Sequence, residues 1–449
     1  MNLSLPDNKT LSYSIDDLDE RTEEFALWMD GNSLAQSEAV CIKNSNGLSK
    51  CNTRISKRDF GKNKTSSNNS LRPNLLLILL DPISRPHFDR SMRKTNATLA
   101  ELDFIRFEKY TAVGPNSGPN QAALYSGTTL AKRDQLRKNL KSNDEWLWDR
   151  LGAAGYVTLK GEDSCIENSN MMQSLVPNTT HGSALHGLFC FDAFSRPNCI
   201  GPDLASTILM EYGHQFISTY EKTMKATDND LRWASFLHFV DSHEDTMLLS
   251  ATLDPGLSNF LKKLDRDDYL ENSVVIVSSD HGLHYGPRFS TPQGRKEATE
   301  PILFIRLPKS LKDKVDMDAL HSNAHRWTTP FDLHETLLEL TQTASGKEGS
   351  TRQGLPLTKL LPQSRKECIT TTDLIPPSFC DFQANDIRKD NADGFCQGST
   401  KIPSIDSFFL DISPANRRPI MNLDADCPAM KTGLDEITKF GLCKEIETG

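Results

Sequence analysis

The 449-residue sequence lacks several features that would place it in a familiar class. Its apolar runs are short, and none approaches the roughly 18 residues that a membrane-spanning helix requires. The net charge is -9, and no block of basic residues forms the arm typical of nucleic-acid-binding proteins. There are no internal repeats. We therefore expect no transmembrane segment in this chain and no nucleic-acid partner.

The start of the chain also lacks the basic and apolar regions of a secretory signal. Ten cysteines are nonetheless present, and they form neither a CxxC pair nor a Cys/His spacing typical of zinc sites. An even number of cysteines, clustered toward the C-terminus, favours disulfides and thus an oxidising compartment. Six Asn-x-Ser/Thr sequons add weak support for a glycoprotein: Asn2, Asn8, Asn63, Asn68, Asn96 and Asn178.

These features predict a protein of the secretory-pathway lumen or the extracellular space, whose targeting segment is missing or was lost from the gene model. A cytosolic protein with free thiols is the alternative, and the start of the chain supports it.

The composition divides the chain into three parts. Residues 1–70 are polar and predict a flexible stem, residues 71–345 contain the apolar segments, and residues 346–449 form a cysteine-containing extension. In the middle part, strands predicted at 75–80, 156–160, 233–240, 274–281 and 301–307 alternate with helices. The main helices are predicted at 95–102, 146–155, 202–225, 257–264 and 329–340, and residues 282–295 are predicted as a loop. This alternation predicts an α/β fold, with a mostly parallel central sheet and helices on both faces.

Residues that commonly bind metals stand at the ends of three predicted strands. They are Asp81, Asp241, His243, Asp280 and His281. The carboxyl ends of parallel strands meet at the edge where α/β proteins bind ligands, so we expect these side chains to gather there. For Asp81 taken alone, capping of the turn at Pro82 explains the residue equally well.

Ser117 lies in a loop of glycine, proline and asparagine, before a helix expected to begin at about Asn120. A lone serine at such a place is most simply an N-cap. The same position also puts a hydroxyl beside free backbone N–H groups and the positive end of the helix dipole, which suit an anionic substrate. Asn120 can orient a substrate oxygen, with helix capping or packing as the alternative.

Eight segments between residues 72 and 382 form an ordered set that is more specific than any of its members. They are LLLILLDPISRPHFDR, VGPNSGPNQAALYSG, LWDRLGAAGYVTLKGEDSC, HFVDSHED, LENSVVIVSSDHGLHYG, GRKEATEPILFIRLP, TTPFDLHETL and CITTTDLIPPSFC. The set resembles the alkaline phosphatase superfamily, which includes sulfatases and phosphoethanolamine transferases. Within it, the chain looks most like an uncharacterised eukaryotic sulfatase-like family, a domain of unknown function. The last segment carries the family's cysteine pair, Cys368 and Cys380.

The resemblance implies one divalent metal, held by Asp81, Ser117, Asp280 and His281, with Ser117 also the nucleophile. Metal coordination lowers the pKa of a serine hydroxyl, which is otherwise a poor nucleophile. Three oxygen ligands with one imidazole favour Zn²⁺, with Mn²⁺ or Ca²⁺ as alternatives.

His243 matches a family histidine that follows the central strand. It can bind a second metal with Asp241, protonate the leaving group or hold a substrate oxygen, while a hydrogen-bonding role within the loop is the alternative. His284 and His325 are weaker candidates for a second metal or for substrate, because each is equally well explained as a surface or structural residue.

The chain departs from ordinary sulfatases at two points. Their nucleophile motif resembles C-x-P-x-R, whereas Ser117 and Gln121 stand here in place of the cysteine and the arginine. The paired aspartates usual after the first strand are reduced to Asp81 followed by Pro82. The absence of a G-x-S-x-G motif argues against acyl transfer.

The sequence therefore predicts a metal-dependent hydrolase or transferase of phosphate esters with a serine nucleophile. The partner would be a small-molecule or a glycan- or lipid-linked ester. A sulfuric ester hydrolase and a non-catalytic extracellular binding protein on the same fold are the alternatives.

Overall fold

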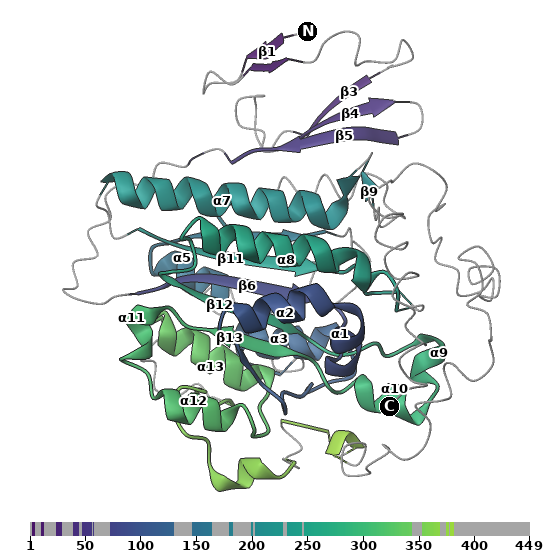
Figure 1. Ribbon diagram of the computed structural model, residues 1–449, viewed down its shortest axis with the longest axis vertical. Coiled ribbons are helices and arrows are strands. Elements are labelled where there is room, and N and C mark those ends of the chain that lie inside the picture. Colours follow the sequence, from purple (N-terminus) through teal and green to yellow (C-terminus); the bar gives the residue numbers. More distant parts are fainter. Residues whose placement is uncertain are drawn as a thin grey trace, which may run out of the picture.

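The structure is a computed structural model (Figure 1). It describes residues 2–4, 10–12, 24–28, 39–44, 47–55, 57, 72–129, 146–163, 179–182, 199–200, 203–227, 231–244, 247–343, 353–368, 374–376 and 378–380. Cys165, Cys190 and the chain beyond residue 380 lie outside these ranges.

Five short strands precede the central sheet. They are β1 (Asn2–Ser4), β2 (Thr10–Ser12), β3 (Glu24–Trp28), β4 (Ala39–Asn44) and β5 (Gly47–Thr53). Strands β1 and β2 form an antiparallel pair, and β3, β4 and β5 form a three-stranded antiparallel sheet. All five lie within the predicted stem. The boundaries proposed between the three parts of the chain stay predictions.

The central sheet has six strands in the order β7-β13-β12-β6-β11-β8. Their bounds are β6 (Asn74–Leu80), β7 (Ile105–Arg106), β8 (Tyr156–Glu162), β11 (Arg232–Phe239), β12 (Ser273–Ser279) and β13 (Leu303–Arg306). Strands β12, β6, β11 and β8 are parallel neighbours, while β13 pairs antiparallel with both β12 and β7. The predicted mostly parallel sheet is confirmed.

Helices cover both faces of this sheet (Figure 1). They are α1 (Arg85–Ser91), α2 (Arg93–Glu101), α3 (Ser117–Ser126), α5 (Leu147–Ala153), α7 (Ala205–Thr227), α8 (Ser250–Arg266), α9 (Gly286–Phe289), α10 (Pro292–Glu297), α11 (Lys309–Lys312), α12 (Met317–Asn323) and α13 (Pro330–Leu340). The short strands β9 (Cys199–Ile200) and β10 (Asp203–Leu204) precede α7, and the 3-10 helix η3 spans Gln363–Lys366.

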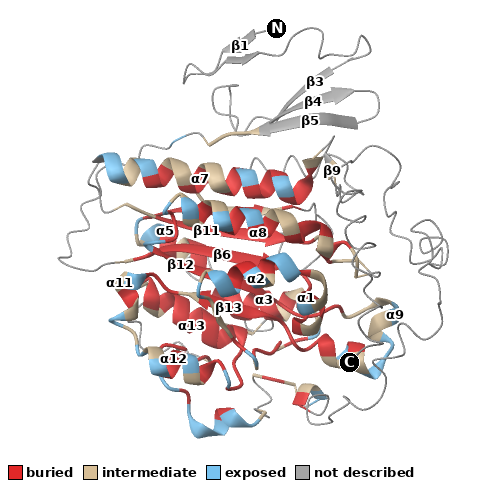
Figure 2. Cartoon of the chain, viewed as in Figure 1, coloured by how far each residue is buried: buried red, intermediate tan, exposed pale blue. Residues whose placement is uncertain are grey.

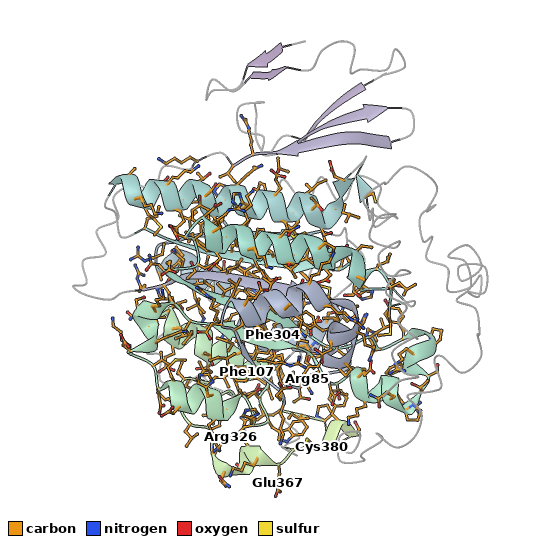
Figure 3. All side chains as sticks on the ribbon, in the orientation of Figure 1. Arg85, Phe107, Phe304, Arg326, Glu367 and Cys380 are labelled. Carbon is orange, nitrogen blue, oxygen red and sulfur yellow. A yellow bond between two sulfur atoms is a disulfide. The ribbon has the colours of Figure 1, made fainter. Side chains whose placement is uncertain are left out.

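Strand β6 is buried on both faces because its side chains alternate between two hydrophobic cores. Leu76, Ile78 and Leu80 pack with α1, α2, α7 and α8, whereas Leu75, Leu77 and Leu79 pack with α3, α5, α11, α12 and α13. Figure 2 shows β6 and its neighbours as the buried centre of the molecule. Phe304 belongs to the first core and Phe107 to the second (Figure 3). A continuous apolar run is therefore what this position requires.

Two predicted elements differ from the structure. The segment 282–295, predicted as a loop, contains α9 and most of α10, so that prediction was wrong in part. The side chain of Thr291 accepts a hydrogen bond from the N–H of Gly294, which caps α10 ahead of Pro292. Helix α8 begins seven residues before the predicted start at 257 and contains Pro255.

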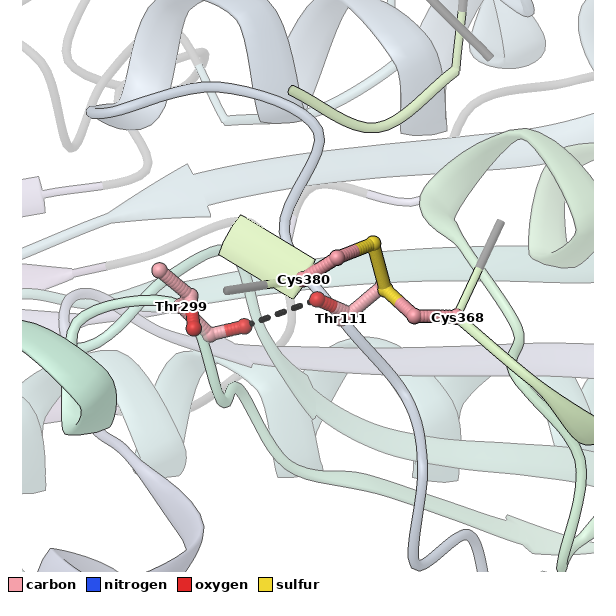
Figure 4. Close-up of a disulfide and its surroundings, with 4 residues drawn as sticks. All are labelled: Thr111, Thr299, Cys368 and Cys380. Carbon is pink, nitrogen blue, oxygen red and sulfur yellow. Dashed lines mark hydrogen bonds between the residues drawn. A yellow bond between two sulfur atoms is a disulfide. The ribbon is translucent and has the colours of Figure 1, made fainter. Parts of the chain in front are cut away.

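The segment after α13 contains a disulfide that lies beside the domain. Cys368 and Cys380 are bonded, which confirms the predicted pair, and Figure 4 shows the bond close to Thr111 and Thr299. Within the described part of the chain, no helix is both long and apolar enough to cross a membrane.

Candidate metal centre

The register of two neighbouring strands places Asp81 beside Asp280. Strands β6 and β12 run parallel, with Leu80 paired to Ser279, so the next residue of each strand emerges at the same edge. The N–H of Asp81 donates to the carbonyl of Phe239 (2.8 Å), which ties this edge to β11. Both aspartates are 2% exposed, so neither carboxylate has water to solvate it.

Ser117 is the first residue of α3, and Asn116 is the N-cap. The helix thus begins three residues before the predicted start, and Ser117 lies inside its first turn rather than ahead of it. Its Oγ lies 3.1 and 3.3 Å from the two carboxylate oxygens of Asp81 and 3.1 Å from Nε2 of His281. Ser117 is half-buried, whereas His281 is fully buried. The four predicted ligands thus lie together, with Ser117 the one that solvent reaches.

Asn120 holds the loop that carries Ser117. Its Oδ1 accepts from the N–H of Val113 (2.7 Å), and its Nδ2 donates to the carbonyls of Gly114 (2.9 Å) and Asn116 (2.8 Å). The side chain is fully buried. Its contacts in this structure are those of the packing alternative, and contact with a substrate stays a prediction.

His281 presents one nitrogen to the site. Its Nδ1 lies 2.7 Å from the carbonyl oxygen of Gly282, to which it must donate. Nε2 therefore carries the lone pair, and it faces Ser117 and the aspartates, as a metal ligand requires.

The donor set fits a divalent metal ion. One ligand atom each from Asp81, Asp280 and His281 lies within 4.8 Å of the others. Among the described residues, no arginine or lysine forms an ion pair with either aspartate, and the ionisable partners of the two carboxylates are His238 and His281. Two buried carboxylates side by side are costly without a compensating cation, and two carboxylates with an imidazole and a hydroxyl can bind one.

The two aspartates have opposite pKa shifts. Burial raises the pKa of Asp81, but the hydrogen bond and charge of His238, with smaller contributions from His243 and His281, lower it well below its usual range. Burial and the charge of Asp81 raise the pKa of Asp280 to about 6. Strongly shifted carboxyl groups of this kind cluster at functional sites.

Sequence reasoning did not identify three residues that support the site. Gln121 donates through Nε2 to Asp81 Oδ2 (3.1 Å) and Asp280 Oδ2 (2.9 Å), so one amide joins the two carboxylates. His238, inside strand β11, lies between Asp81 and Glu162. Burial lowers the pKa of His238, but Glu162 and Asp81 together raise it to about 10. The only sequence signal was the place of Gln121, where sulfatases carry an arginine.

His243 and His284 lie on the side of the site near α9. Nδ1 of His243 is 2.8 Å from the hydroxyl of Tyr285. The ring centroid of His284 lies 4.9 Å from that of His281 and 6.5 Å from that of His243. The structure therefore places His284 between a metal-ligand candidate and the candidate general acid.

The structure does not bring Asp241 or His325 to this cluster. Asp241 accepts from Ser206 Oγ (3.3 Å), and burial raises the pKa of Asp241 although its hydrogen bonds with Asp163 and Ser206 lower it. His325 is exposed at the end of α12, where its N–H donates to the carbonyl of Ser322 (3.3 Å). Their assignment to a second metal or to substrate stays a prediction.

Comparison with known families gave one match. The sequence matches the family described as "Protein of unknown function (DUF229)" over residues 21–176 and 185–395. It matches no curated protein.

Similar solved structures include the lipoteichoic acid synthase LtaP from Listeria monocytogenes, at 14% identity and a TM-score of 0.43, covering 66% of this chain and 78% of that one. An alkaline phosphatase superfamily protein from Vibrio parahaemolyticus has 16% identity and a TM-score of 0.42, with 67% and 73% covered. The putative sulfatase yidJ from Bacteroides fragilis has 13% identity and a TM-score of 0.42, with 66% and 79% covered. Likeness at this level carries no argument about activity.

Proposed function

The chain belongs to the DUF229 family, as its motifs predicted. We propose that it is a metal-dependent hydrolase or transferase of phosphate esters with Ser117 as the nucleophile. One observation carries this proposal. The half-buried Ser117 hydroxyl lies 3.1 Å from the lone-pair nitrogen of His281 and 3.1 Å from the buried carboxylate of Asp81.

In this proposal, Asp81, Ser117, Asp280 and His281 hold one divalent ion. Zn²⁺ is our first choice because the set combines oxygen ligands with an imidazole, and Mn²⁺ or Ca²⁺ are the alternatives. The ion, when bound, lowers the pKa of the serine hydroxyl and offsets negative charge on a phosphate oxygen.

The first turn of α3 provides further groups that suit an anion. Ser117 starts a ten-residue helix, so free backbone N–H groups and the positive end of the helix dipole lie beside its hydroxyl. Such groups stabilise negative charge on a transferring phosphoryl group without rearranging during the reaction.

The covalent sequence has two displacements at phosphorus. Ser117 Oγ releases its proton to solvent and forms a bond to phosphorus, while the bond from phosphorus to the ester oxygen breaks and His243 protonates that oxygen. Water, or the hydroxyl of an acceptor, then attacks the phosphoserine, returns a proton to His243, and releases Ser117, which takes up a proton from solvent. Water gives hydrolysis, and an acceptor hydroxyl gives transfer.

The test is turnover of an aryl phosphate, a phosphodiester and an aryl sulfate by the full chain, with bound metal quantified. We expect turnover of a phosphate ester, and a loss of at least about a thousandfold in Ser117→Ala. Ser126→Ala is the matched control, because it removes a hydroxyl from the other end of α3, where it donates to the carbonyl of Ala122. Equal turnover by wild type and Ser117→Ala would exclude the assigned nucleophile.

The same panel separates the alternatives. Turnover of the sulfate ester alone, with formylglycine at position 117 by mass spectrometry, would replace the proposal by sulfatase chemistry. Absence of both metal and turnover would favour a binding protein.

We further propose a small-molecule or a glycan- or lipid-linked ester as substrate and a secretory-pathway or extracellular location. The Cys368–Cys380 disulfide supports the location, because such bonds persist in oxidising compartments. Enzymatic deglycosylation of the protein from a eukaryotic host tests whether the sequons carry glycans.

A further inference from the structure

We propose that His238 is a positioning residue of the metal centre, which holds the Asp81 carboxylate in its ligand orientation and is itself held by Glu162. The inference rests on the proposed function, and it adds two residues that the sequence motifs did not identify.

The sheet register places the three side chains in one row. His238 on β11 pairs with Leu79 on β6 and with Glu162 on β8. In a parallel sheet, paired residues point to the same face, and so do residues two apart along a strand. Leu79 packs into the core on the α3 side, and Asp81 follows it by two positions. The row therefore leads from the end of β8 to the metal-ligand edge.

The contacts within the row orient Asp81. His238 Nε2 lies 3.2 Å from Asp81 Oδ2, and its Nδ1 lies 3.2 Å from Glu162 Oε2. Gln121 also donates to Asp81 Oδ2. With Oδ2 held from two sides, Oδ1 is turned toward His281 Nε2, 3.7 Å away. Groups that fix a metal ligand in this way typically change metal affinity by 10- to 100-fold when removed.

Burial argues that His238 serves more than packing. The residue is 4% exposed and lies between Leu237 and Phe239, which are fully buried. An apolar residue would fill such a strand position without the cost of burying a polar ring beside the buried Asp81 carboxylate. The contact with Asp81 explains why a histidine stands at this buried position.

Two substitutions of His238 separate its two contacts. In His238→Gln the amide nitrogen takes the place of Nε2 and keeps the donor to Asp81. In His238→Asn the amide nitrogen takes the place of Nδ1, so the contact with Glu162 remains and the donor to Asp81 is lost. Calorimetric titration of Zn²⁺ into the metal-free full chain should give at most a roughly tenfold loss of affinity for His238→Gln, because this variant loses only the contact with Glu162. For His238→Asn we expect about 10- to 100-fold weaker binding.

The matched control is His214→Asn. His214 and Asp267 form another histidine–aspartate pair, with the same Nε2–Oδ2 distance of 3.2 Å, remote from the cluster. We expect its Zn²⁺ affinity to equal that of wild type. Circular dichroism and thermal melting check that each variant is folded.

Glu162→Leu serves if His238→Asn does not fold, because the side chain of Glu162 is 23% exposed at the strand end. It should weaken Zn²⁺ binding by roughly tenfold. Wild-type affinity in His238→Asn or Glu162→Leu, or equal losses in His238→Asn and His238→Gln, would overturn the inference. A wild-type protein that binds no Zn²⁺, Mn²⁺ or Ca²⁺ would instead overturn the proposed metal centre itself.

Discussion

Nε2 of His281 lies 3.1 Å from the Ser117 hydroxyl because the next residue turns the ring. The carbonyl of Gly282 takes the Nδ1 proton, and this leaves the Nε2 lone pair for the site. Gly282 is tightly enclosed, since a Cβ there would lie 2.2 Å from the carbonyl oxygen of Glu297. The His-Gly pair in the sequence thus combines a ligand with the close backbone approach that orients it.

Gly282→Ala should therefore impair metal binding as well as folding. The added methyl group must displace the α10 backbone or the Gly282 carbonyl, and overpacking of this kind costs roughly 1–3 kcal/mol. We expect a lower melting temperature and weaker Zn²⁺ binding, measured by thermal melting and calorimetric titration. The control is Gly152→Ala in α5, where a Cβ meets nothing within 4 Å and alanine favours the helix. A Gly282→Ala protein with wild-type melting and affinity would contradict the enclosure.

Asp280→Asn should weaken metal binding and stabilise the metal-free protein. Asp81 and Asp280 are buried carboxylates joined by the amide of Gln121, and without a cation their like charges oppose folding. Removing one charge should raise the metal-free melting temperature and shrink the increase that Zn²⁺ produces. Scanning calorimetry with and without Zn²⁺ measures both. The exposed Asp313→Asn should change neither. A lower metal-free melting temperature in Asp280→Asn would show that charge repulsion is not the dominant effect.

The site residues identified from the sequence are marked by a pattern within one short segment, whereas the residues that were missed depend on pairing between strands. Asp81, Asp280 and His281 follow continuous apolar strands, so an abrupt change of polarity marks them. His238 is a polar residue inside the mostly apolar segment WASFLHFV, and that position by itself indicates a core histidine. Its role depends on the pairing of β11 with β6 and β8, which no window of one strand contains.

The sequence pattern also could not predict the direction of a strand or the presence of a short helix. An apolar run such as Leu303–Arg306 predicts a strand but not its antiparallel pairing with β12. Helix α9 has four residues, too few to show a helical period. The longer helix α13 was predicted at 329–340, and in the structure Thr329 and Asp332 form a capping box at its start.

The lowered pKa of His87 predicts that the folded protein loses stability in mild acid. Burial, followed by the charge of Arg90, lowers its pKa from 6.5 to about 4. Between these values the unfolded chain binds a proton that the folded chain does not, so the free energy of unfolding falls as pH falls through this window. A shift of this size corresponds to about 3 kcal/mol. Chemical denaturation at pH 7, 6, 5 and 4 measures it.

The control for this pH dependence is His87→Gln, whose amide can still donate to the carbonyl of Met247, which His87 Nε2 contacts at 3.0 Å. Its stability should fall less than that of wild type between pH 7 and 4, while the exposed His321→Gln should follow wild type. Parallel profiles for wild type and His87→Gln would exclude His87 as the source.

Arg365→Leu should loosen the segment after α13 from the domain. Arg365 makes two contacts with the carboxylate of Asp332, at 3.1 and 3.2 Å, and the two side chains are 6% and 0% exposed. Removing one partner of a buried pair leaves the other charge uncompensated, which costs about 3–5 kcal/mol. Asp332 keeps its hydrogen bonds from Thr329 and Leu355, so the loss should lie toward the lower end.

Lys359→Ala is the matched control for Arg365→Leu, because Lys359 joins the same segment to the same helix through Glu339 (3.1 Å), but with 71% of its side chain exposed. Exposed pairs contribute at most about 1 kcal/mol. Chemical denaturation should therefore rank Arg365→Leu well below Lys359→Ala in stability. Similar small losses in both would mean that solvent reaches the Arg365 pair, and that the segment is held instead by its apolar contacts.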